Sequence, residues 1–493
     1  MNTSKRQSAN SKRKTLIADF ETITDPKDCR VWAWGLLNIE VCNDDNWMDS
    51  FDYGIDIDSF LDKCSIENAN IYFHNLAFDG TFIIDKLLRT GYKHTTEKLK
   101  ENEFSTLISK EGLFYSIRVK WSDGTFTEFR DSWKKIPLSV ERIPSAYGIE
   151  YKKLDLNYTD NSNRPIGHKL TDIELEYLSH DIIIVARALK MQLDQGMTKL
   201  TVGSDSLTEY KSLVGSKQFR KLFPAYTLSM DAEIRQAYRG GFTYAAEKYR
   251  GKIVGPIRVY DVNSLYPYIM HERPLPYSLP LFVAGGPEEK EGYDLFITTI
   301  TFTAKLKKNH IPCIQVKNTS RFLATEYVKV IKEPVTLTCT NVDLKLWMDQ
   351  YDLNIISFSG TWLFKSIKGV FNEYIDKWMA VKKVSKGGAR EIAKLHLNSL
   401  YGKFATNPNV TSKIPVLESD DIVHLRLGEP ETRDPVYTPM GVFITSWARD
   451  WTIRAAQDHF DIFAYADTDS LHLVTDKEPE NLLIHPSNLG SWN

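Results

Sequence analysis

The sequence has no apolar run long enough to cross a membrane, which limits the classes of protein it can encode. Its longest apolar runs, such as IIIVARAL at 182–189, are far shorter than the roughly 20 residues of a spanning helix. The N-terminus also lacks the apolar core of a signal peptide. We therefore expect no membrane partner and a cytoplasmic location.

Cysteine is scarce, and an excess of charge of either sign is missing. The five cysteines are an odd number without a C-x-x-C pair, which argues against a zinc site or a disulfide framework and fits a reducing compartment. The net charge is −2, so any nucleic acid would have to be bound by local positive charge.

With 493 residues, the chain is long enough for two to four domains with a large core. Its composition, 42% hydrophobic and 26% charged, is ordinary for a globular protein. Residues 1–14 are polar and basic, which predicts a disordered tail, with weak attraction to phosphate as the alternative.

The run IFAYADTDSLHLV at 462–474 predicts a hairpin with two carboxylates at its tip. Apolar residues on both sides favour short strands, and Asp-Thr-Asp between them is typical of a tight turn. Asp467 and Asp469 concentrate negative charge there, which Mg²⁺ neutralises in many phosphate-handling sites. A solvated turn is the alternative, because Asp and Ser favour turns through local hydrogen bonds.

Four acidic residues in the first two hundred stand beside apolar sequence on separate predicted elements. TLIADFETIT predicts a strand with Asp19 and Glu21 on one face. Asp79 follows a β-rich run, and Tyr177 and Asp181, four apart, share a face of a predicted helix. Such a set suits two metal ions about 3.5–4 Å apart, with the tyrosine orienting a water. For each residue alone, a helix cap or a surface acid is the alternative.

Two stretches of the second half combine charge with backbone features that suit a phosphate ligand. AYRGGFTY predicts a turn at Gly240 and Gly241 that a ligand could approach closely, with a plain connector as the alternative. RVYDVNSLYPYIM predicts a strand that delivers Asp261 to a helix N-terminus, where backbone N–H groups can receive phosphate.

The run AREIAKLHLNSLYG predicts a helix with one basic face. That face carries the side chains of Arg390, Lys394, Asn398 and Tyr401. A solvated surface is the alternative, but Asn and Tyr within the stripe favour a ligand.

DFET, NLAFD and YLSHD, in this order, resemble the three exonuclease motifs of family B DNA polymerases. The resemblance implies a 3′→5′ exonuclease domain with a ribonuclease-H-like α/β fold and two Mg²⁺ ions, which Mn²⁺ can replace. The implied metal ligands are Asp19, Glu21, Asp79 and Asp181, with Asp155 as a further candidate, and Tyr177 lies beside the attacking water. The implied contacts to the single-stranded primer end are Thr22, His74, Asn75, Phe78, Lys153 and Tyr158.

YRGG, DVNSLYP, KLHLNSLYG, TPMGVFITSWAR and YADTDS resemble the linker and polymerase motifs of the same family. They imply a right-hand polymerase domain whose palm holds two further Mg²⁺ ions. The implied palm ligands are Asp261, the carbonyl of Val262, Asp467 and Asp469. The implied nucleotide-binding residues are Tyr266, which would exclude a 2′-hydroxyl, Lys382, Arg390, Lys394, Asn398 and Tyr401. The implied DNA contacts are Tyr238, Gly240, Gly241, Thr445 and Arg449.

The expected fold class is a multidomain α/β and α+β protein, with an exonuclease domain at 15–200 and palm and fingers at 201–493. Two insertions, at about 273–370 and 405–437, resemble those of the protein-primed, phi-twenty-nine-like phage polymerases. The resemblance to that subgroup implies binding of a terminal protein and strand displacement.

The sequence therefore predicts a monomeric, protein-primed DNA polymerase with 3′→5′ exonuclease that replicates linear viral DNA in the host cytoplasm. Its expected partners are a DNA primer–template, deoxynucleoside triphosphates and a terminal protein. Only 23 residues follow Ser470, so we expect the family's Lys-x-Tyr motif and thumb to be absent. Two alternatives stay open: an exonuclease whose polymerase half extends poorly, and an inactive remnant that binds DNA or terminal protein.

Overall fold

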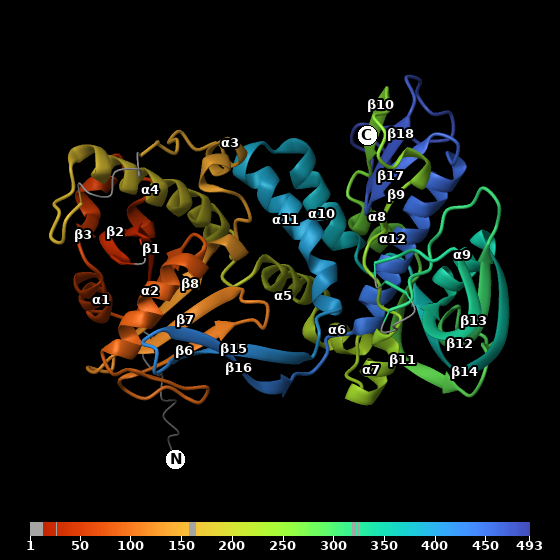
Figure 1. The fold of residues 1–493 in the computed structure, drawn as a ribbon, viewed down its shortest axis with the longest axis horizontal. Helices are drawn as coiled ribbons and strands as arrows, with labels where there is room; N and C mark the ends of the chain where they lie inside the picture. Colours follow the sequence, from red (N-terminus) through yellow and green to blue (C-terminus); the bar gives the residue numbers. More distant parts are fainter. Residues whose placement is uncertain (1–12, 26, 157–163, 318–321, 324) are drawn as a thin grey trace, which may run out of the picture. The chain divides into compact units, whose positions relative to one another are not determined.

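A computed structural model describes residues 13–25, 27–156, 164–317, 322–323 and 325–493. Tyr158 and most of the expected tail lie outside these residues. The described chain forms two compact units (Figure 1). Unit 1 runs to Asp205 and includes Ser385–Ile392 and Asn409–Arg433; unit 2 comprises the remaining residues. This mixed α/β, multidomain architecture agrees with the predicted fold class. None of the described helices is long and apolar enough to span a bilayer.

Unit 1 is built on one eight-stranded sheet with the order β3-β2-β1-β4-β8-β7-β6-β5. Its strands are β1 (Lys14–Ile23), β2 (Arg30–Asn38), β3 (Phe51–Gly54), β4 (Ala69–Phe73), β5 (Lys93–His94), β6 (Glu103–Ile108), β7 (Phe114–Lys120) and β8 (Phe126–Asp131). Its helices are α1 (Ile57–Ser65), α2 (Leu76–Arg89), α3 (Ile143–Tyr147) and α4 (Asp172–Asp194).

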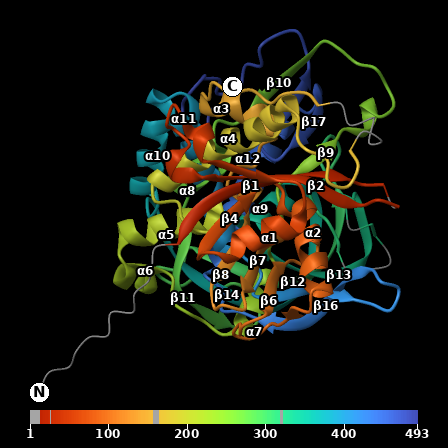
Figure 2. The same cartoon turned by 90° about the vertical axis from the view of Figure 1, so that its left-hand side faces the viewer.

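Alternation along β1 sends its side chains to two different helical layers. On one face Phe20 packs edge-on against Phe60 of α1 at 4.8 Å, and α1 and α2 lie side by side there (Figure 2). On the other face the partner of Asp19 in β2 is Gly35, where an added Cβ would meet side chains of α4 at 2.6 and 3.1 Å. The acidic residues of β1 therefore face α4.

A hairpin from late in the sequence also belongs to unit 1. It consists of β15 (Asn409–Leu417) and β16 (Val423–Thr432), within the second expected insertion. Ser412 forms a β-bridge with Ser109, and Arg89 of α2 pairs with Asp421 at 2.7 Å. These contacts attach the hairpin to the edge of the sheet that contains β6.

Unit 2 contains a small antiparallel sheet with the order β10-β18-β17-β9. Its strands are β9 (Thr243–Ala245), β10 (Ile257–Asp261), β17 (Phe463–Asp467) and β18 (Ser470–Val474). The hairpin predicted at 462–474 is thus confirmed. Two helices, α8 (Leu265–Glu272) and the buried α12 (Thr438–Asp458), pack against each other, and α12 also contacts β17 and β18.

The first expected insertion forms a second antiparallel sheet in unit 2, with the order β11-β14-β12-β13. It comprises β11 (Leu275–Val283), β12 (Leu295–Leu306), β13 (Val330–Thr340), α9 (Asn341–Gln350) and β14 (Tyr351–Ile367). Helix α9 also packs against α12 and so joins the two sheets of this unit.

Unit 2 also contains all or most of five further helices: α5 (Val202–Val214), α6 (Ser216–Leu222), α7 (Leu228–Arg235), α10 (Asn372–Val384) and α11 (Gly387–Phe404). The first residues of α5 and of α11 are assigned to unit 1. An aromatic cluster joins three of these segments, because the ring of Tyr210 in α5 lies 4.8 Å from Phe371 and 6.3 Å from Phe404. The helix predicted around Lys394 is confirmed.

Candidate active sites

Four carboxylates of unit 1 face a common region between β1, α2 and α4. Glu21 and Asp181 are buried, Asp19 is half-buried, and Asp79 is 3% exposed in the first turn of α2. Tyr177 lies one turn before Asp181 on the buried face of α4. The four predicted ligands therefore meet, although they come from three separate elements.

Crowding and burial make these carboxylates reluctant to ionise. Burial raises the pKa of Asp79 to about 8, and the charge of Glu21 contributes. The pKa of Asp19 is raised well above its ordinary value by burial and then by the charges of Asp79, Glu21 and Asp181. Burial also raises the pKa of Asp181. Such a cluster gains most from a partner of high positive charge.

Lys153 is a protein cation beside this cluster. Its ammonium group forms an ion pair with Asp181, and it donates to the hydroxyl of Tyr177 at 3.2 Å. Partial burial alone would lower the pKa of Lys153, but the Asp181 carboxylate raises it. The lysine predicted as a DNA contact is thus placed at the carboxylates, between the tyrosine and one of the expected metal ligands.

The donor set fits a divalent cation. Oδ1 of Asp79 and Oδ1 of Asp181 are buried without a hydrogen-bond partner, an arrangement that is costly unless a ligand completes it. Among the described residues, however, no three of these four carboxylates have oxygens that all lie within 4.8 Å of one another. The four carboxylates are therefore not closed around a single ion.

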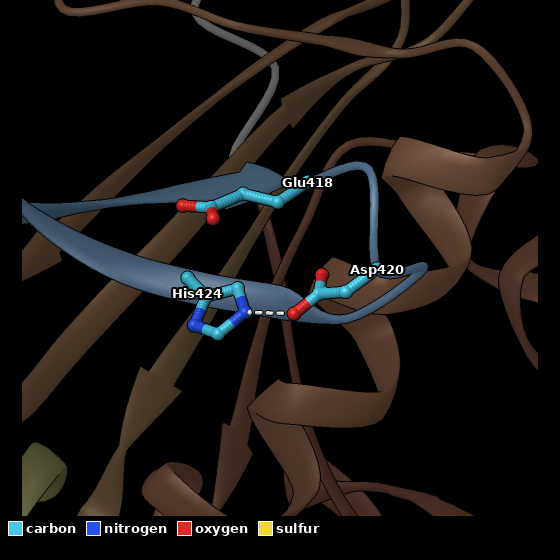
Figure 3. Close-up of side chains that lie close together, drawn as sticks. All are labelled: Glu418, Asp420 and His424. Carbon is cyan, nitrogen blue, oxygen red and sulfur yellow. Dashed lines mark hydrogen bonds and ion pairs between the residues drawn. The ribbon is translucent and has the colours of Figure 1, made fainter.

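One group of the described residues does meet that spacing, at the tip of the β15–β16 hairpin (Figure 3). It consists of Glu418, Asp420 and His424. Asp420 accepts a hydrogen bond from His424 at 2.9 Å, and Glu418 accepts one from Arg426 at 2.6 Å. Because each carboxylate already has a basic partner at the surface, this group is satisfied without a metal ion.

The segment between β4 and α2 carries the predicted contacts to a primer end. Phe78 is 44% exposed and presents a ring that a base could stack on, and the side chain of Asn75 is also exposed. His74 differs, because its two ring nitrogens lie 2.9 Å from the Ser132 hydroxyl and 2.8 Å from the Leu138 carbonyl. Both nitrogens are engaged within the chain, so its DNA contact stays a prediction.

The remaining predicted residues of unit 1 lie at its accessible surface. Thr22 is half-buried on β1, and Asp155 is exposed in the extended segment that carries Lys153. Neither position tests the role that we predicted for it.

Sequence reasoning missed Asp131, which organises this segment. Its Oδ1 accepts backbone N–H groups of Asn75 at 3.1 Å, of Leu76 at 3.4 Å and of Trp133 at 3.0 Å. It ends β8, which pairs in parallel with β4, so it stands at the sheet edge where α2 begins. A strand-terminal Asp was the only signal, and without the strand pairing it could not be distinguished from a surface acid.

The three predicted palm carboxylates gather around one residue of unit 2. In the strand register Ser470 of β18 is paired with Asp261 of β10 on one side and with Asp467 of β17 on the other. The two aspartates are thus two strand spacings apart, roughly 10 Å between Cα atoms. Asp469 stands in the turn, and partial burial and the charges of Asp261 and Asp467 raise its pKa.

Hydrogen bonds fix the turn that carries Asp469. The N–H of Val262 donates to the carbonyl of Asp469 at 2.8 Å, and the hydroxyl of Thr243 donates to Oδ1 of Asp467 at 2.8 Å. Thr468 has a positive φ of 56° and is held by the carbonyl of Phe242 and the hydroxyl of Thr452. The turn is therefore anchored from both neighbouring strands and from α12.

Gly241 packs directly against this turn. A Cβ at Gly241 would lie 2.4 Å from Oγ1 and 2.9 Å from Cγ2 of Thr468, whereas one at Gly240 would meet nothing within 4 Å. We predicted that both glycines allow a ligand to approach. In the structure, the lack of a side chain at Gly241 makes room for the turn that carries Thr468 and Asp469.

Thr445 and Arg449 are buried in α12, with 1% and 5% exposed. The Arg449 guanidinium pairs with Asp343 of α9 at 2.7 Å and donates to the carbonyls of Arg239 and Gly240 at 2.6 and 2.9 Å. Their predicted DNA contacts remain untested. What the structure shows is a buried ion pair that holds the loop leading to Gly241.

The predicted nucleotide-binding residues come from three helices of this region. Tyr266 of α8 stacks on Tyr401 of α11, with ring centroids 4.1 Å apart. Lys382 of α10 donates to the hydroxyl of Ser264, the residue before α8, at 2.9 Å. Tyr238 is half-buried, and burial raises the pKa of the Tyr266 and Tyr401 hydroxyls. Arg390, Lys394 and Asn398 follow one another on α11 at intervals of four residues, and each is at least partly exposed.

Comparison with known proteins identifies relatives over nearly the whole chain. Residues 62–166 and 157–485 match the family described as DNA polymerase type B, organellar and viral. The DNA polymerase of Bacillus phage M2 is 44% identical over 487 residues, which are 97% of this chain and 84% of that protein. That of Streptococcus phage Cp-1 is 31% identical over 499 residues, which are 96% of this chain and 84% of that protein.

Solved structures agree with these relatives. Phi29 DNA polymerase complexed with primer-template DNA and incoming nucleotide substrates matches with a TM-score of 0.92. It is 42% identical, and the match covers 98% of this chain and 84% of that one. The same polymerase complexed with single-stranded DNA matches with a TM-score of 0.91.

Proposed function

The chain belongs to the type B DNA polymerases of organelles and viruses, and we propose that it pairs protein-primed synthesis with a 3′→5′ exonuclease. As a member of this family it is a DNA-directed DNA polymerase, and the family implies dependence on a divalent metal. The observation that carries the proposal is the presence of a separate carboxylate cluster in each unit, each beside groups suited to nucleic acid.

In the polymerase site, helices α8 and α11 would orient the reactants. Lys394, with Arg390, would bind the negative charge of an incoming triphosphate, and Tyr266 would pack under its sugar and exclude a 2′-hydroxyl. Asp261 and Asp467 would hold two Mg²⁺ ions, or Mn²⁺, assisted by Asp469 and the carbonyl of Val262. When bound, such ions stabilise the attacking and leaving oxygens of an in-line displacement.

In the exonuclease site, Asp19, Glu21, Asp79 and Asp181 would hold a second pair of ions by the same logic. The Tyr177 hydroxyl would orient the attacking water, with Lys153 holding that hydroxyl in place. The exposed ring of Phe78 would stack on the terminal base of a single strand. The two unpartnered buried oxygens, on Asp79 and Asp181, support this assignment.

We propose DNA primer–templates, deoxynucleoside triphosphates and a terminal protein as partners. Phi29 DNA polymerase has been solved with primer-template DNA and with incoming nucleotides, which supports the first two. The terminal protein would supply a side-chain hydroxyl as the first primer. The template would be linear viral DNA, copied with strand displacement in the host cytoplasm.

A labelled primer–template incubated with Mg²⁺ tests both sites at once. We expect extension with deoxynucleotides and shortening without them. Asp467→Ala should abolish extension and spare shortening, and Asp19→Ala should do the reverse. Loss of both activities from either substitution would contradict two separate sites. Shortening without extension by the unmodified chain would instead identify an exonuclease with an inactive polymerase half.

A further inference from the structure

Beneath the basic face of α11, unit 2 contains a buried polar cluster that none of the assigned roles uses. Its centre is His396, 2% exposed, which lies between Lys394 and Asn398 in the sequence. Residues two positions apart on a helix point about 200° apart, so His396 is directed away from the face that we assign to the nucleotide. The side chain of His396 therefore points into unit 2, on the side of α11 opposite to Lys394 and Asn398.

The His396 ring is held from two other helices. It stacks on the indole of Trp378 in α10, with centroids 4.0 Å apart and planes 6° apart. Its Nδ1 lies 3.1 Å from Oε2 of Glu209 in α5, 3.1 Å from the Tyr374 hydroxyl and 3.3 Å from the Ser206 hydroxyl. An ionised carboxylate only accepts hydrogen bonds, so the contact with Glu209 favours the form of His396 that carries a hydrogen on Nδ1.

Glu209 of α5 contacts both α10 and α11. The same Oε2 that faces His396 of α11 accepts a hydrogen bond from the Trp378 indole of α10 at 3.1 Å. Its other oxygen, Oε1, pairs with Lys377, whose side chain is 48% exposed. One carboxylate thus sets how α10 and α11 are rotated relative to each other.

We propose that Glu209 and His396 are positioning residues for the incoming nucleotide. Through their hydrogen bond they would fix the rotation of α11 about its axis, and with it the positions of Lys394 and Asn398. A rotation of about 10° moves a side-chain end that lies roughly 5–6 Å from the helix axis by about 1 Å. A displacement of that size can break a hydrogen bond from Lys394 to the triphosphate, and a hydrogen bond to a charged group is worth about 10- to 100-fold in binding.

Two substitutions at His396 separate hydrogen bonding from packing. His396→Asn keeps a side-chain donor near the position of Nδ1 but loses the ring, whereas His396→Phe keeps a ring on Trp378 but loses the donor. We expect the KM for deoxynucleotides to rise about 10- to 100-fold in the Phe variant and to stay within about threefold in the Asn variant. The kcat at saturating nucleotide should change much less than KM.

A double-mutant cycle tests whether the two residues act as a pair. Glu209→Met should raise KM as His396→Phe does, and the double variant should be no worse than either single one. Lys377→Met is the matched control, because it removes the exposed ion pair of the same carboxylate and a cation–π contact to Trp378 but keeps both residues of the Glu209–His396 pair, and exposed ion pairs contribute little. Multiplying effects in the double variant, or a normal KM in the Phe variant, would overturn the proposal.

Shortening of the primer without nucleotides serves as the folding control, because the carboxylates of the exonuclease site lie in unit 1. A variant with normal shortening and a normal melting temperature but a raised KM is folded, and its nucleotide-binding side chains are displaced. The inference rests on the proposed role of Lys394, so Lys394→Ala is measured in parallel. If Lys394→Ala raises KM and His396→Phe does not, only the positioning role fails. If Lys394→Ala leaves KM unchanged, the proposed nucleotide-binding face itself is wrong.

Discussion

Gly241→Ala should impair polymerisation through a contact entirely within unit 2. The new Cβ would lie 2.4 Å from Oγ1 and 3.0 Å from Cβ of Thr468, and Thr468 has little freedom because neighbouring backbone and the Thr452 hydroxyl hold it. Ordinary contacts need roughly 3.5 Å, so the turn or the loop must move by about 1 Å. That movement is transmitted to Asp467 and Asp469 on either side of Thr468.

A shift of about 1 Å in catalytic groups predicts a loss of about 10- to 100-fold in the rate of nucleotide incorporation. This corresponds to roughly 1.4–2.7 kcal/mol of transition-state stabilisation. The assay is single-nucleotide incorporation at saturating nucleotide and Mg²⁺, with exonuclease shortening as the internal control. Thr468→Gly combined with Gly241→Ala should restore the rate, because it removes the clashing side chain and a glycine tolerates the positive φ of that position.

Substitution of the neighbouring Gly240 distinguishes packing against the turn from contact with DNA. At Gly240 an added Cβ meets nothing within 4 Å, so packing against the turn predicts a much smaller effect from Gly240→Ala. A DNA backbone lying along the loop would instead make the two substitutions similarly harmful. Equal losses at Gly240 and Gly241, without rescue by Thr468→Gly, would refute the packing argument.

Three further predictions concern the other clusters. Burial raises the pKa of Asp79 from 3.8 to about 8, so the folded chain holds a proton that the unfolded chain releases. Without divalent cations, thermal stability should therefore fall as the pH rises from about 4 to about 8, and Asp79→Asn should flatten that dependence. Tyr266→Ala should relax discrimination against ribonucleotides while Tyr266→Phe retains it; unchanged relative incorporation in the Ala variant would contradict the sugar-packing role. Asp343→Ala leaves the Arg449 charge buried without its partner and should cost about 3–5 kcal/mol in urea unfolding, and a loss below about 1 kcal/mol would show that water replaces the carboxylate.

Much of both sites could be predicted because their residues lie in short motifs with strong local patterns. Alternation along β1 places Asp19 and Glu21 on one face, and the turn chemistry between β17 and β18 places Asp467 and Asp469 at a tip. Such information is local, so it can be obtained from the sequence without knowledge of the tertiary fold.

What the sequence could not provide was the partner of each polar side chain. Arg449 was expected to contact DNA because its motif resembles one of family B polymerases, but that motif does not reveal that the guanidinium pairs with Asp343 inside the protein. Asp131 becomes important only because β8 pairs in parallel with β4, a contact between distant parts of the chain. Likewise, the approach that Gly241 permits involves a threonine far along the sequence.

The β15–β16 hairpin has a consequence for the order in which the protein can mature on the ribosome. Unit 1 needs residues Asn409–Arg433 to be complete, yet 195 residues of unit 2, Ser206–Val384 and Ala393–Pro408, come before them in the chain. The eight-stranded sheet can form early, but the edge that carries Ser109 must wait for Ser412 to emerge. A stop of translation before residue 409 would therefore release a first unit that lacks the hairpin contacting Ser109.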